Sequence, residues 1–338
     1  MFPRPQHFLA LTGTVAVAAL LLAACSGDAA ETTGGDEEPS ANVVATTMQV
    51  GSLAEQITQC GGGETQTLMS AGDDPHQFEA SSAQVAGMIT ADLVIANGLG
   101  LESAMQRSLD NAATDGAQLF ELAPELDPLP YGDDHAHEHD DEESEHAHAD
   151  EEHDHGDDDH DHAHGDYDSH VWLDVSRMAH GAELIGEQIA AATGDDAYIS
   201  CGQEVATELR EVDAEVEETL SVLETPRLVT DHAAYGYFAD RYGVEVSGVV
   251  IPGGSTGGEP SSQELTELTQ LLDDEGADAL VTSQANTDPM VTALAEETTN
   301  DVPVVALYES GIGEPGSDAE TYQDAMLYNA NALVDALQ

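Results

Sequence analysis

Two runs of alternating short apolar strands and helical segments constrain the fold of this chain more than any other feature. In the first run, the predicted strands are residues 42–48, 66–70, 93–96 and 118–121, with helices at 52–58, 82–89 and 101–112. In the second run, the predicted strands are 227–230, 244–251, 279–282 and 304–307, with helices at 234–242, 262–275, 289–299 and 321–336. Strands that alternate with helices predict parallel sheets covered by helices. We therefore expect an α/β protein with two similar lobes, each containing a parallel sheet flanked by helices.

Two further helical segments lie between these runs, at residues 176–192 and 198–223. In the second segment, apolar residues recur at steps of three and four, which is the period of one buried helix face. These residues are Val205, Leu209, Val212, Val216, Leu220 and Leu223. Pro226 is expected to end this helix, because proline lacks the backbone N–H that a helix needs. We expect one long helix, residues 197–225, to join the two lobes.

A tract rich in histidine and acidic residues separates the first run from these helices. It contains ten histidines between residues 135 and 164, mostly as H-x-H pairs among Asp and Glu. Imidazole and carboxylate are common protein ligands of borderline divalent metal ions. We interpret the tract as an accessory metal-binding loop; an inert, solvated low-complexity loop is the alternative. The histidines are His135, His137, His139, His146, His148, His153, His155, His160, His162 and His164.

The charge balance excludes some classes of partner. The chain has 68 Asp and Glu residues against 6 basic residues, all of them arginine, and a formal net charge of -62. Such a charge repels nucleic acid and anionic membrane surfaces, and it favours cations as ligands. Part of the acidity lies outside the tract, for example in residues 204–224. This part is typical of a strongly hydrated surface suited to a salty environment.

The N-terminus has the pattern of a secretory signal peptide at residues 1–24, in which a basic start precedes an apolar run too short for a membrane span. The run ends in Leu22-Ala23-Ala24-Cys25, which resembles the lipobox of bacterial lipoproteins. The alternative is an ordinary signal peptide with a chance cysteine. Residues 25–41 are small and acidic, which predicts a flexible tether. We expect a lipid on Cys25 to anchor the protein to the cell membrane, on the periplasmic side or outer face.

Two cysteines, Cys60 and Cys201, are left once Cys25 is assigned to lipid. An exported protein is exposed to a compartment that permits disulfides, so these two residues are candidates for one. Two separate buried thiols are the alternative. A zinc site of the C-x-x-C type is excluded, because the chain contains no such pair.

Four potential metal ligands follow predicted strands or loops. They are His76 after the strand at 66–70, His170 after the tract, His232 after the strand at 227–230, and Glu309 after the strand at 304–307. Ligands bind at the carboxyl edge of parallel sheets, so these side chains can converge between the lobes. Three imidazoles and one carboxylate suit Zn²⁺ better than Mn²⁺, Mg²⁺ or Ca²⁺. Taken singly, each residue is more typical of an ordinary surface or core position, as is His180 on its helix.

Several motifs resemble those of a known family. They are D-D-P-H-Q-F-E at 73–79, A-D-L-V-I-A-N-G-L-G-L-E at 91–102, S-H-V-W-L-D at 169–174, D-H-A-A-Y-G-Y-F at 231–238 followed by R-Y-G-V, and L-Y-E-S at 307–310. In this order, from about residue 43 to the C-terminus, they are similar to the metal-binding solute receptors of bacterial ABC importers, lipoproteins that take up zinc or manganese. A His-rich loop before the second histidine motif is typical of the zinc-type (ZnuA-like) members.

The resemblance implies two α/β lobes bridged by one long helix, with metal held in the interlobe cleft by three histidines and a carboxylate. It assigns these roles to His76, His170, His232 and Glu309. Family members usually carry Asp where Glu309 stands, so this residue could bind or leave room for water. The family's W-L-D-P is W-L-D-V here, and the usually acidic residue after the third histidine is Ala233. We therefore expect Asp231 or another group to support His232.

The expected function is that of an extracytoplasmic receptor, monomeric and without catalytic activity, that delivers Zn²⁺ to an ABC permease in the cytoplasmic membrane. A manganese receptor of the same family, a surface adhesin and a metal buffer are the alternatives. A zinc hydrolase is less favoured, because the chain has no H-E-x-x-H motif and a four-ligand site leaves no position open for a substrate. The expected domains are the signal peptide (1–24), the tether (25–41), an N-terminal lobe (42–196, including the loop 131–168), the connecting helix (197–225) and a C-terminal lobe (226–338).

Overall fold

The computed structural model describes residues 40–131, 167–251, 256–258, 260–274, 276–284 and 289–338. The signal peptide, Cys25, nearly all of the tether and the ten histidines of the tract lie outside the described residues. The described residues belong to one compact unit. Among them, no helix is long and apolar enough to cross a membrane.

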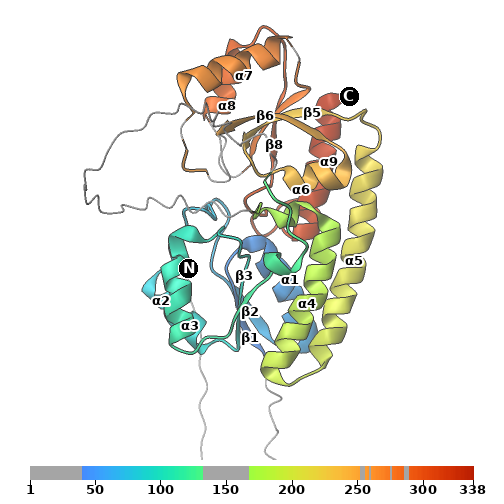
Figure 1. Cartoon of the computed structure of the whole chain (residues 1–338). Coiled ribbons are helices and arrows are strands. Elements are labelled where there is room, and N and C mark those ends of the chain that lie inside the picture. The colour runs from blue at the N-terminus through green and yellow to red at the C-terminus, as the bar shows by residue number, and fades with distance from the viewer. Residues whose placement is uncertain (1–39, 132–166, 252–255, 259, 275, 285–288) are drawn as a thin grey trace, which may run out of the picture. The chain divides into compact units, whose positions relative to one another are not determined.

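The helices and strands of the first part of the chain follow the predicted alternation (Figure 1). They are β1 (Asn42–Ala45), α1 (Met48–Gly61), β2 (Glu64–Thr67), α2 (Ser82–Thr90), β3 (Leu93–Ala96), α3 (Gln106–Thr114) and β4 (Leu119–Glu121). A short 3-10 turn (Val171–Leu173) then leads to α4 (Val175–Thr193) and α5 (Ala197–Leu220).

The second part repeats the pattern with β5 (Arg227–His232), α6 (Gly236–Tyr242), β6 (Glu245–Ile251), α7 (Ser262–Asp274), β7 (Ala279–Ser283), α8 (Pro289–Glu297), β8 (Val304–Leu307) and α9 (Tyr322–Leu337). The two four-stranded sheets have the orders β2-β1-β3-β4 and β6-β5-β7-β8, and all of their pairs are parallel. The predicted α/β fold with two similar lobes is confirmed.

Each sheet is covered on both faces, because successive strand residues point to opposite sides. In the first lobe, Val44 and Val94 pack toward α2 and α3, whereas Val43 and Ile95 pack toward α1 and α4. In the second lobe, α7 and α8 cover one face and α6 and α9 cover the other. The inner faces of the two lobes share one continuous hydrophobic core. A shared core resists large movements of one lobe against the other, because separating the lobes exposes apolar surface.

Helix α5 lies against elements of both lobes, contacting α1 as well as α9, and it runs alongside α4 (Figure 1). The helix pair α4 and α5 packs closely at Gly186 and Gly202. A Cβ atom built on Gly186 would lie 2.5 Å from the carbonyl oxygen of Tyr198, and one on Gly202 would lie 2.6 Å from that of Ala182. These two glycines therefore permit the close approach of the two backbones.

Several helix boundaries differ from the sequence prediction, and short side chains account for two of them. Helix α5 ends at Leu220, before the proline expected to end it, because Ser221 Oγ donates to the carbonyl oxygen of Glu218 at 2.6 Å and competes with the helical pattern. Helix α1 begins at Met48, inside the predicted first strand, because the Thr47 side chain caps the helix by accepting from the N–H of Val50. Both differences arise from short side chains that hydrogen-bond to nearby backbone.

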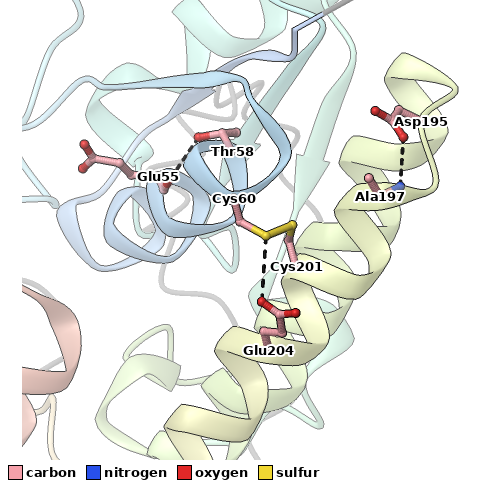
Figure 2. The surroundings of a disulfide bond; sticks show 7 residues. All are labelled: Glu55, Thr58, Cys60, Asp195, Ala197, Cys201 and Glu204. Carbon is pink, nitrogen blue, oxygen red and sulfur yellow. Dashed lines mark hydrogen bonds between the residues drawn. A yellow bond between two sulfur atoms is a disulfide. The ribbon is translucent and has the colours of Figure 1, made fainter. Parts of the chain in front are cut away.

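A disulfide between Cys60 and Cys201 joins the end of α1 to α5, with their Cα atoms 5.9 Å apart (Figure 2). Cys60 is exposed, whereas Cys201 is buried among core residues. The two cysteines left after the assignment of Cys25 are therefore paired in the structure. The disulfide links the first helix of the N-terminal lobe to the helix that contacts both lobes.

An ion pair between Arg241 and Asp213 joins α6 to α5. It allows the contribution of a buried carboxylate and its cation to stability to be measured. Arg241 Nε donates to Asp213 Oδ1 at 3.0 Å, a second guanidinium nitrogen contacts Asp213 Oδ2, and the Tyr242 hydroxyl donates to Asp213 Oδ1 at 3.0 Å. Asp213 is only 7 % exposed. We expect Arg241→Met to lower the free energy of unfolding by about 2 kcal/mol, because the buried carboxylate loses its cation.

Urea denaturation measures this effect, and Arg210→Met is the matched control. Arg210 pairs with Glu183 at 2.7 Å, but the Arg210 side chain is 52 % exposed, so its loss is expected to cost no more than about 0.5 kcal/mol. Equal losses in the two variants would show that burial of Asp213 is not the cause.

Candidate metal site

His76 lies in a loop that follows β2, and its backbone is fixed by a nearby carboxylate. The N–H of His76 donates to Asp74 Oδ1 at 2.9 Å, and the residue is 8 % exposed. The sequence predicted that His76 directly follows a strand ending at residue 70. Strand β2 instead ends at Thr67, so the His76 position depends on the loop and its turn at Asp74 rather than on the strand end.

His170 directly precedes the 3-10 turn, and its ring orientation is set by Asp168. The Asp168 Oδ1 atom accepts from the His170 N–H at 2.9 Å and lies 2.7 Å from His170 Nδ1. Asn97 Nδ2, at the end of β3, donates to the carbonyl oxygen of Ser169 at 2.9 Å. These contacts aim the Nε2 atom of His170 away from Asp168 and toward the other two histidines.

His232 is the last residue of β5, and an aspartate holds its ring in the same way. Asp231 Oδ1 lies 3.0 Å from His232 Nδ1, and Asp231 Oδ2 accepts from the N–H of Ser283 at 3.0 Å. Ser283 ends β7, the neighbour of β5, so this contact lies where the strand order of the second sheet reverses. Parallel sheets bind ligands at such a point, outside the carboxyl ends of the strands.

Glu309 follows β8 by two residues and approaches His232 from the same lobe. Glu309 Oε2 lies 3.8 Å from His232 Nε2, and Glu309 Oε1 accepts from Ser310 Oγ at 2.6 Å. The side chain is buried, with 2 % of the residue exposed.

The structure brings the three predicted histidines together, and Glu309 adjoins this group through His232. The ligand atoms of His76, His170 and His232 all lie within 4.8 Å of one another, and Nε2 of His76 is 3.2 Å from Nε2 of His170. Glu309 forms a second such group with His232 and Asp231, so His232 is the member that the groups share. His232 Nε2 is buried and makes no hydrogen bond to any of the residues that the structure describes. A buried polar atom that makes no hydrogen bond is costly, and a cation bound between His232 Nε2 and Glu309 Oε2 would offset this cost.

The electrostatics of the cluster reflect two histidines in different surroundings. Burial lowers the pKa of His170 well below its usual value, and the nearby His232 lowers it further. Burial acts in the same direction on His232, but the negative charges of Glu309 and Asp231 outweigh it and raise the His232 pKa to about 9. Burial also raises the pKa of Glu309, and it raises the pKa of Asp168 to about 7. The cluster therefore combines neutral imidazole with buried carboxylates that a cation would stabilise.

The sequence alone did not identify several residues that shape this cluster. Asp168 lies two residues before His170, and this short spacing from a candidate ligand could have identified it. Glu102 ends the motif at 91–102, but its role was not predicted: its buried carboxylate accepts from Thr46 Oγ1 at 2.7 Å and from the N–H groups of Asn97 and Gly98 at 2.7 and 3.0 Å. By fixing Asn97, this carboxylate supports the loop that carries His170.

Comparison with known proteins identifies the family. The family described as "Zinc-uptake complex component A periplasmic" (ZnuA) matches residues 43–336, which is most of the chain. The chain belongs to this family. Membership makes it a metal-binding receptor of an ABC-type uptake system rather than an enzyme, which confirms the receptor function expected from the motifs.

Some relatives are named for zinc and others for manganese. The chain is 36 % identical over 300 residues to the high-affinity zinc uptake system protein ZnuA of Paracoccus denitrificans, covering 85 % of this chain and 89 % of the relative. It is 26 % identical to the manganese-binding lipoprotein MntA of Bacillus subtilis, covering 97 % and 99 %. Among solved structures, the periplasmic zinc binding protein TroA of Treponema pallidum superposes with a TM-score of 0.70 at 23 % identity, covering 88 % of this chain and 99 % of that one. This last likeness concerns the fold.

Proposed function

We propose that this receptor binds Zn²⁺ through His76, His170, His232 and Glu309 and delivers it to a permease in the cytoplasmic membrane. The observation that carries the proposal is the buried convergence of three imidazoles, whose ligand atoms lie within 4.8 Å of one another. In a chain with a net charge of -62, such a cluster attracts a cation, and its three nitrogen donors select among cations.

The donor set and its spacing support zinc. Imidazole suits zinc, whereas Mn²⁺ prefers carboxylate, carbonyl and water oxygens in an octahedral arrangement. Tetrahedral Zn²⁺ with bonds of about 2.0–2.1 Å places its ligand atoms about 3.4 Å apart. The separations of 3.2 Å between His76 and His170 and of 3.8 Å between His232 and Glu309 lie on either side of this value.

A manganese receptor is the second candidate, because two relatives that match nearly the whole chain are named manganese-binding lipoproteins. Metal content and competition titration distinguish the two candidates. The mature chain lacking residues 133–166 is expected to bind one Zn²⁺ tightly and to lose it slowly to a chelator, with Mn²⁺ bound far more weakly. Preferential retention of Mn²⁺ would establish the second candidate, and loss of all tight binding with the deleted residues would refute the site.

The aspartates behind the histidines are expected to strengthen metal binding. A carboxylate on the remote ring nitrogen fixes the tautomer and raises the basicity of the ligating nitrogen, and its loss commonly costs 10–100-fold in affinity. We expect Asp231→Asn to weaken Zn²⁺ binding by about 10–100-fold in a competition titration. Asp278→Asn is the matched control, because Asp278 accepts from the N–H of Arg227 far from the cluster. Equal affinities of the Asp231→Asn variant and the unaltered protein would exclude this role.

Zinc binding is expected to release a proton near neutral pH. The pKa of His232 is raised to about 9, so its imidazole is mostly protonated in the metal-free site, whereas a metal-bound imidazole is neutral. The proton competes with the metal, so affinity should fall as pH decreases below about 9 and level off above it. Calorimetric titrations at about pH 8 in buffers of different ionisation enthalpy measure the release of about one proton. Identical heats in all buffers would contradict this expectation.

The sequence outside the described residues supports two further parts of the proposal. The lipobox at Cys25 supports a lipid anchor on the outer side of the cytoplasmic membrane. The ten histidines of the tract support accessory, weaker metal sites. Deleting residues 133–166 is expected to lower the number of Zn²⁺ ions bound per chain, and unchanged stoichiometry would remove the tract from the proposal.

A further inference from the structure

The backbone of Glu309 is held by residues of the opposite lobe. Its carbonyl oxygen accepts from Trp172 Nε1 at 2.6 Å and from Gln49 Nε2 at 3.3 Å. Trp172 and Gln49 are each 2 % exposed, so water does not compete for this carbonyl group. Trp172 lies in the 3-10 turn after His170, and Gln49 lies at the start of α1, so both donors come from the N-terminal lobe.

Trp172 also contacts two other parts of the interlobe region. Its ring packs edge-on against the ring of His170, with centroids 5.2 Å apart. Its carbonyl oxygen accepts from the hydroxyl of Tyr322, the first residue of α9, at 2.6 Å. One residue therefore contacts a candidate ligand in each lobe: His170 through the ring and Glu309 through the indole N–H.

The segment that carries Glu309 lies outside regular secondary structure, and contacts within its own lobe hold Tyr308 and Ser310 on either side of it. Strand β8 ends at Leu307 and helix α9 begins at Tyr322, so Glu309 lies in an irregular connection. Its neighbour Tyr308 is fixed within its own lobe by Asn329, whose side chain accepts from the Tyr308 N–H at 2.7 Å and donates to the Tyr308 carbonyl oxygen at 2.8 Å. The next restraint on the main chain is the carbonyl of Glu309 itself. Because the Glu side chain is long and has several rotatable bonds, the position of its carboxylate depends strongly on where the backbone is held.

We infer that Trp172 and Gln49 are positioning residues that set the distance of the Glu309 carboxylate from the three imidazoles. This inference rests on the proposed zinc function and extends it. The position of the Glu309 carboxylate then depends on how the lobes are arranged. A displacement of one lobe against the other by about 1 Å is enough to break the hydrogen bonds that hold the Glu309 backbone. Metal is then held by four groups when the lobes are docked and by the imidazoles alone when the Trp172 contact is lost.

Two substitutions remove the donors, and a third serves as the matched control. Trp172→Phe keeps an aromatic ring beside His170 but removes the indole N–H, and Gln49→Leu removes the second donor. Tyr322→Phe deletes a hydrogen bond between the same lobes, to the carbonyl of Trp172, and leaves both donors to Glu309 in place. A merely structural role for these residues would affect all three variants alike.

The experiment follows the first equivalent of Co²⁺ added to the full mature chain, because the visible absorption of Co²⁺ depends on its ligands and coordination number. His232→Ala supplies the spectrum of Co²⁺ bound elsewhere on the chain, and Glu309→Gln supplies that of the site without the carboxylate. We expect Trp172→Phe and Gln49→Leu to shift the spectrum toward that of Glu309→Gln and to weaken Co²⁺ binding by about 10-fold. The same substitutions made in Glu309→Gln should weaken it no further.

Three outcomes would overturn the inference and leave the zinc site standing. They are additive losses of affinity in the double variants, wild-type spectra in both single variants, and an equal spectral shift in Tyr322→Phe. A wild-type spectrum identical to those of both His232→Ala and Glu309→Gln would overturn the proposed site itself, and the inference with it. Far-UV circular dichroism checks that Trp172→Phe is folded. If that variant fails to fold, Gln49→Leu, which replaces a side chain of similar size, decides the question.

Discussion

Replacing His232 by alanine is expected to abolish tight zinc binding while leaving the protein folded. Structural zinc sites bind with about 10–16 kcal/mol shared among four ligands, so one lost ligand is worth on the order of 3 kcal/mol, or at least about 100-fold in affinity. The loss should be larger at His232 than at the other histidines, because His232 is the member shared by both groups of potential ligands. Without it, Glu309 and Asp231 no longer share an imidazole with His76 and His170.

Competition titration against a chromophoric chelator measures this loss, and His180→Ala is the matched control. His180 lies on α4 with its side chain 55 % exposed, so its removal deletes an imidazole far from the cluster. Zinc affinity that survives in His232→Ala would mean that the tight site lies elsewhere. A parallel fall in both variants would point to a nonspecific effect of histidine content.

The metal-free His232→Ala protein should also be less stable than the unaltered protein. Glu309 and Asp231 are both buried, and the positive charge of the protonated His232 stabilises them, as its raised pKa of about 9 indicates. Removing this group leaves two carboxylates buried without a neighbouring cation, which lowers the free energy of unfolding. The buried carboxylates of the site therefore need a positive charge, which either the proton on His232 or a bound metal ion can supply.

The regular elements could be predicted where local sequence decided the structure. Strands β3 and β8 match their predicted ranges because each is a short, continuous apolar run, the first between Asp92 and Asn97 and the second directly after Pro303. The start of α1 and the end of α5 could not be predicted to the residue, because hydrogen bonds from Thr47 and Ser221 decide them. A hydrophobic pattern identifies the buried face of a helix more reliably than it identifies the helix ends.

The candidate ligands could be predicted from residue type and from their position after strands, but the residues that position them could not. Trp172 and Glu309 are separated by 137 residues in sequence, and Gln49 and Glu309 by 260. Such contacts depend on how the two lobes dock, which a local pattern does not specify. The acceptor in both contacts is the backbone carbonyl of Glu309. Every residue has such a group, so no residue type at this position indicates the contact.

Removing the disulfide is expected to have the largest effect on stability of any substitution away from the site. The bond between Cys60 and Cys201 closes a loop with a sequence separation of 141 residues, and the entropy that such a loop removes from the unfolded chain is worth about 3–5 kcal/mol. We expect the double variant Cys60→Ala/Cys201→Ala to lose about this much free energy of unfolding in urea. Reductant should destabilise the unaltered protein to the same level and leave the double variant unchanged.

Zinc affinity should change little in this variant, because the disulfide is not the only restraint on α1. The N–H of Tyr322 donates to Ser52 Oγ at 3.1 Å, and Gln56 exchanges side-chain hydrogen bonds with Gln323 at 2.8 and 3.1 Å. These contacts hold α1 against α9 near the end that carries Gln49, whereas Cys60 lies at the other end of the helix. A loss of stability with unchanged affinity would assign the disulfide to the fold. A parallel loss of affinity would instead mean that the whole of α1 must be fixed to α5 before Gln49 can hold Glu309.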